Sequence, residues 1–131
     1  DIEVQWLSTQ AVVYKKNNIN NLLFDENLGQ YSYLEDLDFS YTISKKSKLM
    51  VVSKAKYTHP NFIERKDFDF GKKEIVNRFY FVKKNNLIKT FFFFSSIIKI
   101  IVDLLKILIG NFLLKKVAGN IYGLFICLIK K

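Results

Sequence analysis

The sequence predicts an α/β domain that is followed by apolar helices, and two observations lead to this fold class. β-Branched and aromatic residues give strand character to residues 3–14, 49–52 and 55–58. Apolar residues at helical spacing indicate one helix that begins near Leu34 and another over residues 70–85. We therefore expect strands and helices to alternate before the apolar helices begin.

A change in composition after Asn86 divides the chain into two predicted domains, residues 1–86 and residues 87–131. With 131 residues, the chain is long enough to bury one small core. It begins with Asp1, and Val4 already reads as the middle of a strand. We interpret the chain as a fragment, or as a chain whose front half was lost.

The acidic segment Glu35-Asp36-Leu37-Asp38 holds the strongest candidates for chemistry. On the predicted helix, Glu35 and Asp38 share one face and Asp36 points elsewhere. Acidic residues in a first turn suit the positive end of the helix dipole. A carboxylate held there beside apolar neighbours can act as a general base for a hydroxyl. The same pattern also fits an ordinary acidic helix start.

Five short motifs follow one another along the first domain: Trp6-Leu7-Ser8, Tyr14-Lys15-Lys16, Phe24-Asp25-Glu26, Tyr33-Leu34-Glu35-Asp36-Leu37-Asp38, and His59. This ordered set resembles the family 2 glycosyltransferases, over residues 4–84. The resemblance implies the acceptor-binding half of a GT-A catalytic domain, a partial nucleotide-diphospho-sugar transferase fold that lacks its N-terminal nucleotide-binding half.

The resemblance implies a role for each candidate site residue. Asp36 would be the catalytic base that takes the proton of an acceptor hydroxyl in an inverting sugar transfer, and Glu35 would support it. Trp6 either stacks on a sugar ring or anchors the core. Asp25 either faces the acceptor or caps a loop, and Asp38 belongs to the substrate-binding set. His59 is either a ligand of the divalent metal or a loop residue.

The intact enzyme implied by this resemblance would bind a nucleotide-sugar donor with Mg²⁺ or Mn²⁺, and we expect the fragment alone to be inactive. Some positions depart from the family pattern. Thr9 and Gln10 stand where small residues are usual, and Thr42 stands where an Arg pairs with Asp38. These departures favour an alternative, a catalytically inactive membrane-bound remnant or an interaction module.

The second domain has one narrow polar stripe on an apolar helix predicted over residues 87–109. The stripe advances by steps of three and four residues through Ser96, Lys99, Asp103, Lys106 and Gly110. A charged side chain costs ~2.5 kcal/mol or more at the centre of a bilayer. We therefore predict a helix that lies in the membrane interface, with a spanning hairpin whose stripe turns inward as the alternative.

A shorter apolar helix is predicted over residues 117–129, where Gly119 and Gly123 lie four residues apart. This spacing allows close contact with a neighbouring helix. Cys127 is the one cysteine of the chain, and we expect it to be a small buried apolar residue.

The net charge of +9 and its distribution indicate the class of partner. Residues 87–131 contain seven Lys against one Asp and are also the most apolar part of the chain. This combination predicts an anionic membrane surface, and lysine placement predicts its cytoplasmic face. With two Arg in the whole chain, a nucleic-acid partner is not expected. The acceptor is therefore expected to be lipid-linked or a surface polysaccharide.

Overall fold

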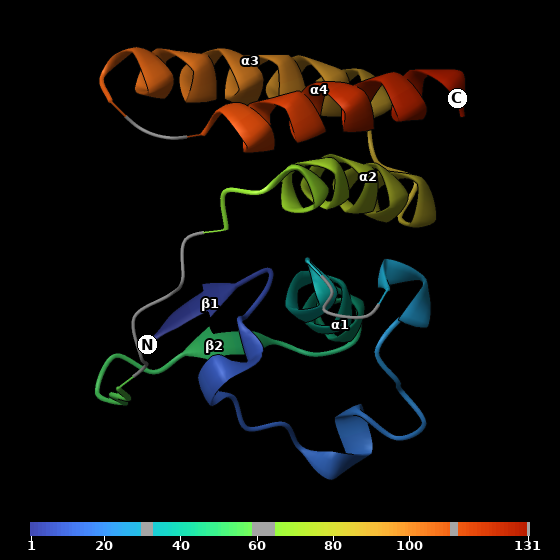
Figure 1. Cartoon of the computed structure of the whole chain (residues 1–131). Helices are drawn as coiled ribbons and strands as arrows, with labels where there is room; N and C mark the ends of the chain where they lie inside the picture. The colour runs from blue at the N-terminus through green and yellow to red at the C-terminus, as the bar shows by residue number, and fades with distance from the viewer. Residues whose placement is uncertain (30–32, 59–64, 111–112, 131) are drawn as a thin grey trace. The chain divides into compact units, whose positions relative to one another are not determined.

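A computed structural model describes residues 1–29, 33–58, 65–110 and 113–130 (Figure 1). The chain divides into two compact units, which we call unit 1 (Asp1–Phe62) and unit 2 (Ile63–Lys131). Unit 2 contains the two helices of the predicted second domain together with the helix that precedes them. The domain boundary after residue 86 stays a prediction.

Unit 1 is built from one helix and a short sheet. The sheet pairs β1 (Ile2–Val4) antiparallel with β2 (Leu49–Val51), so that Glu3 lies opposite Met50. The remaining elements are α1 (Glu35–Ser44) and three single turns of 3₁₀ helix: η1 (Thr9–Ala11), η2 (Lys16–Asn18) and η3 (Glu26–Leu28). The helix predicted to begin near Leu34 is thereby confirmed.

The predicted α/β, GT-A-like fold class is wrong. The described residues form four α-helices and one two-stranded antiparallel sheet, whereas a GT-A half is built on parallel strands with helical crossovers. The strand predicted over residues 49–52 forms as β2, the one predicted over residues 3–14 forms only at its start, as β1, and the one predicted over residues 55–58 does not form. β-Branched residues favour a strand where the pleated surface is half-buried, but Val13 is 98% exposed and residues 55–58 are exposed throughout.

The core of unit 1 gathers around Phe39 on the inner face of α1. Phe39, Ile43 and Leu49 are buried, and partly buried apolar side chains from the first 22 residues pack against them: Val4, Leu7, Tyr14, Ile19 and Leu22. The ring of Phe24 stacks on Phe39 with centroids 4.4 Å apart, and Tyr14 meets it edge-on at 5.5 Å. The irregular segment before α1 is therefore held by aromatic contacts to that helix.

Unit 2 consists of three helices: α2 (Phe68–Lys84), α3 (Lys89–Leu108) and α4 (Leu114–Ile129). They confirm the helices predicted over residues 70–85, 87–109 and 117–129. The Asp67 side chain caps α2 by accepting the Phe70 N–H at 2.7 Å. Helices α3 and α4 lie side by side, and α2 packs against both (Figure 1).

Glycines bring the backbones of α2 and α4 together, as the spacing of Gly119 and Gly123 predicts. A Cβ at Gly119 would overlap the carbonyl oxygen of Phe68, and one at Gly71 would overlap that of Lys116. A Cβ at Gly123 would lie 2.9 Å from the carbonyl oxygen of Lys72. Any larger residue at these positions would separate the two helices.

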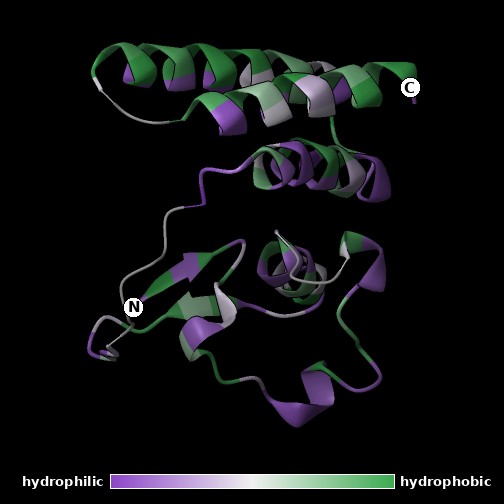
Figure 2. Cartoon of the chain, in the orientation of Figure 1, coloured by the Kyte–Doolittle hydropathy of each residue, from purple (hydrophilic) through white to green (hydrophobic). Residues whose placement is uncertain are grey.

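The polar stripe of α3 faces the interior of unit 2. Ser96 and Asp103 are buried, whereas apolar residues on the other faces of α3 are exposed, including Phe91 (70%) and Leu108 (81%). In Figure 2 the ribbons of α3 and α4 are largely green, whereas purple and green alternate along α2. Within the described residues, no helix is both long enough and apolar enough to cross a membrane.

Candidate functional site

The candidate base Asp36 lies in the first turn of α1, where Glu35 is the first helical residue. Both side chains are half-buried. Leu34, at the N-cap, has a φ of +80°, a left-handed conformation that branched side chains rarely adopt. Its carbonyl oxygen accepts the N–H of Asp38 at 2.9 Å, so the helix begins directly after this strained residue.

Two hydroxyl groups from the N-terminal segment reach the Asp36 carboxylate. The Thr9 hydroxyl donates to Oδ1, and the Ser8 hydroxyl lies 3.5 Å from Oδ2. These contacts join two of the family-like motifs, 28 residues apart in the sequence, at one side chain. Because a carboxylate has about four acceptor positions, Asp36 keeps capacity for a further donor such as a substrate hydroxyl.

Ser40 fixes the position of that N-terminal segment. It is fully buried one turn after Asp36, and its Oγ accepts the N–H of Leu7 at 3.0 Å. The same oxygen lies 2.7 Å from the carbonyl oxygen of Asp36, to which its hydroxyl donates. Ser40 thus ties the backbone beside Ser8 and Thr9 to the first turn of α1.

Tyr14 adds an electrostatic feature to this region. Its hydroxyl oxygen is buried and has no hydrogen-bond partner among the described residues. Burial raises the pKa of Tyr14 above its ordinary value, and the negative charge of Asp36 raises it further. The Tyr14 hydroxyl therefore stays neutral to a higher pH than that of a free tyrosine.

The other predicted site residues occupy different environments. Trp6 is 51% exposed and lies two residues before Ser8 in the sequence. Asp25 caps η3 by accepting the backbone N–H of Asn27 at 3.0 Å. Asp38 is 4% exposed, in the interior of unit 1. The predicted metal ligand His59 lies outside the described residues.

Sequence reasoning missed the contributions of Thr9, Ser40 and Tyr14. Thr9 stood out only as a departure from the family pattern, yet its hydroxyl holds the candidate base. Ser40 carries a local signal that was available, because a residue four positions after Asp36 lies on the same face of a helix. The contact between Ser40 and Leu7 has no local signal, since these residues are 33 positions apart.

The divalent metal that the family resemblance implies stays a prediction, because its predicted ligand His59 lies outside the described residues. Among them, no group of three His, Cys, Asp or Glu side chains lies close enough together to hold a metal ion. Glu35, Asp36 and Asp38 occupy one turn, but their side chains do not converge into such a group.

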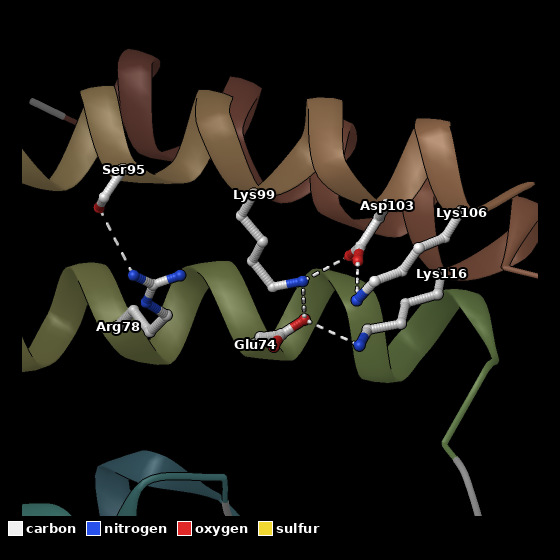
Figure 3. A network of polar contacts seen from close by, with 7 residues as sticks. All are labelled: Glu74, Arg78, Ser95, Lys99, Asp103, Lys106 and Lys116. Carbon is white, nitrogen blue, oxygen red and sulfur yellow. Dashed lines mark hydrogen bonds and ion pairs between the residues drawn. The ribbon is translucent and has the colours of Figure 1, made fainter.

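A second polar cluster lies between α2 and α3 in unit 2 (Figure 3). Lys99 Nζ lies 3.1 Å from Glu74 Oε2 and 2.6 Å from Asp103 Oδ2. Lys116, from α4, approaches the same Glu74 oxygen at 3.5 Å, and Lys106 lies 3.7 Å from Asp103 Oδ1. We call these five residues the interior charge cluster.

The lysines of the interior charge cluster lower the pKa of the Asp103 carboxyl group. Burial by itself raises the pKa of this carboxyl group. The hydrogen bond and charge of Lys99, together with the charges of Lys116 and Lys106, outweigh that effect, so the pKa falls below its ordinary value. Asp103 is therefore ionised at neutral pH. The ion pairs of the cluster join residues of α2, α3 and α4.

Compared with models of protein families, with curated proteins and with solved structures, the chain matches none.

Proposed function

We propose that this chain supplies the acceptor-activating part of an inverting glycosyltransferase. The donor would be a nucleotide-diphospho-sugar, and the acceptor a hydroxyl of a lipid-linked or polysaccharide intermediate. One observation carries the proposal: the Asp36 carboxylate meets the hydroxyls of Ser8 and Thr9 at the start of α1. Two motifs of the family resemblance, far apart in sequence, thereby meet at the residue that the resemblance makes the base.

In the proposed reaction, the acceptor hydroxyl donates a hydrogen bond to Asp36. Its oxygen attacks the anomeric carbon of the donor while its proton passes to the carboxylate. The bond between that carbon and the diphosphate breaks, and the nucleoside diphosphate leaves with the bonding electron pair. A single displacement of this kind inverts the anomeric centre. The accessible ring of Trp6 would stack on a sugar beside this carboxylate.

The test is Asp36→Asn in the protein expressed from its complete coding sequence. Release of nucleoside diphosphate and formation of glycosylated product would be measured with membrane-derived acceptors. Because asparagine cannot accept the proton, we expect turnover to fall about 10²- to 10⁴-fold while donor binding is retained. Glu3→Gln is the matched control, since it makes the same change at an exposed carboxylate whose ion pair with Lys48 lies at the surface.

Turnover in Asp36→Asn equal to that of Glu3→Gln would refute the base assignment. A second candidate function, a non-catalytic membrane-bound module, is favoured by one observation: the described residues lack a parallel sheet on which a sugar-nucleotide fold is built. That candidate predicts no donor-dependent product from the unsubstituted protein, with membrane binding unchanged.

A further inference from the structure

The outer surface of α3 is apolar along its whole length. Phe91, Phe94, Ile101, Leu105 and Leu108 are 50–81% exposed, and they extend over most of the helix. On α4, Phe125 is 58% exposed and contributes to the same kind of surface. Large exposed apolar areas of this extent mark sites that bind another apolar partner.

The polar residues of α3 are turned away from this surface. Asp103 is 5% exposed, Ser96 is fully buried, and the Lys99 side chain is 22% exposed. The interior charge cluster satisfies these charges inside the helix unit (Figure 3). A helix that packs its charges inward and exposes isoleucine, leucine and phenylalanine is arranged for an apolar environment.

The net charge of the chain belongs wholly to unit 2. Residues 63–131 contain 14 Lys and Arg against five Asp and Glu, whereas residues 1–62 contain seven of each sign. The unit with the exposed apolar helices is therefore also the cationic one. This combination complements a surface that is apolar inside and anionic outside, which is the character of a membrane containing acidic phospholipids.

We infer that α3 and α4 bind in the plane of an anionic phospholipid bilayer, with their outer faces among the upper acyl chains. The layer order of unit 2 sets this orientation. Helix α2 packs on both α3 and α4 and carries Lys72, Lys73, Lys83 and Lys84. One side of the unit is thus apolar and the other is charged, so α2 lies toward the headgroups and water.

A bilayer fits this surface better than a second protein does. The exposed side chains lie on the outer faces of two neighbouring helices. A protein partner would need a groove that fits these faces, whereas a fluid lipid surface adapts to them. Lysines near the helix ends, such as Lys89 and Lys130, are placed to reach phosphate groups by extending their side chains. This inference does not depend on the proposed sugar transfer, and its test uses no enzymatic activity.

The first experiment measures binding of the full chain to sedimenting vesicles. Vesicles of phosphatidylcholine alone are compared with vesicles containing phosphatidylglycerol. We expect strong binding to the anionic vesicles only. The double variant Ile101→Ser, Leu105→Ser should weaken it about tenfold or more, because two inserted apolar side chains are lost. The control Val13→Ser, Leu23→Ser removes two apolar residues of unit 1 that are even more exposed, and this variant should bind like the unsubstituted chain.

The second experiment distinguishes an in-plane helix from a spanning one. Tryptophan is placed at Phe94→Trp or at Leu108→Trp, each with Trp6→Phe, so that the only indole lies on α3. The two positions are about 21 Å apart along the helix axis. Quenching by lipids brominated at known depths should place both indoles at the same shallow depth. A difference in depth approaching the axial distance would overturn the in-plane orientation.

Other outcomes also decide the inference. If the Ile101→Ser, Leu105→Ser variant binds anionic vesicles like the unsubstituted chain, the outer face of α3 is not the lipid-binding surface. Equal binding to neutral vesicles would remove the anionic requirement. If the chain sediments as a dimer that these two substitutions dissociate, and it binds no vesicles, then a second copy covers the apolar face.

Discussion

The ammonium nitrogen of Lys99 lies 3.1 Å from Oε2 of Glu74, so one ion pair joins the middle of α3 to α2 inside unit 2. The two side chains are 22% and 8% exposed. An ion pair at this depth gives up much of its hydration, and its members depend on each other for compensation. The ion pair and the buried Phe92 and Ile100 of α3 all lie on the inward side of this helix.

We predict that Lys99→Met lowers the free energy of unfolding by up to about 3 kcal/mol, because it leaves Glu74 and Asp103 with fewer compensating charges in the interior. Urea unfolding followed by circular dichroism measures the change. The double variant Glu74→Gln, Lys99→Met should lose less than the sum of the two single variants. Strict additivity would show that the two groups do not interact.

Acid should weaken unit 2 through Asp103. Its pKa is lower in the folded chain than in the unfolded chain, so the stabilisation is present above the unfolded pKa, about 4, and is lost as the pH falls through the folded pKa. The free energies of unfolding of Asp103→Asn and of the unsubstituted chain should differ most near pH 6 and converge toward pH 2. Parallel curves over this range would contradict the role of the carboxylate.

The sequence was sufficient to locate the helices of unit 2 but not to orient them. Steps of three and four residues place Ser96, Lys99 and Asp103 on one stripe, and this stripe exists. Periodicity identifies two faces of a helix without saying which face is covered. The structure shows that the face with the polar stripe is the covered one. There Lys99 is paired with Glu74, which lies 25 positions earlier in the sequence.

Less of the structure of unit 1 could be predicted from the sequence. The acidic motif correctly predicted a helix start with Asp36 in the first turn. The strands predicted around Val13 and over residues 55–58 did not form, because β-propensity depends on a partner strand and a covering layer that no local pattern provides. Likewise, the hydroxyl contacts to Asp36 depend on Ser40 holding a segment 33 positions earlier.

Gly119 should tolerate no side chain. The Cβ of Gly119→Ala would overlap the Phe68 carbonyl oxygen on α2, so the two helices must separate. We expect a loss of about 3 kcal/mol or more in the free energy of unfolding, measured by urea titration. Ala118→Ser, at the exposed neighbouring position, should change stability by less than about 0.5 kcal/mol. A Gly119→Ala variant as stable as this control would disprove the close approach of the backbones.

Cys127 should be nearly inert toward alkylation while the chain is folded. Its side chain is 1% exposed, and burial raises the pKa of the thiol to about 11 from an ordinary value of 9.0. At pH 8 the folded chain then holds about 100-fold less thiolate than the unfolded chain. Labelling with iodoacetamide, followed by mass spectrometry, should be slower by at least this factor without guanidinium than with it. Because the chain has one cysteine, every added carbamidomethyl group there reports on this site.

Since the folded pKa is the higher one, the stabilisation from the neutral thiol should persist below about pH 9 and disappear as the pH rises through about 11. Rapid labelling of the folded chain at pH 8 would show that the contact of Cys127 with the core of unit 2 opens readily.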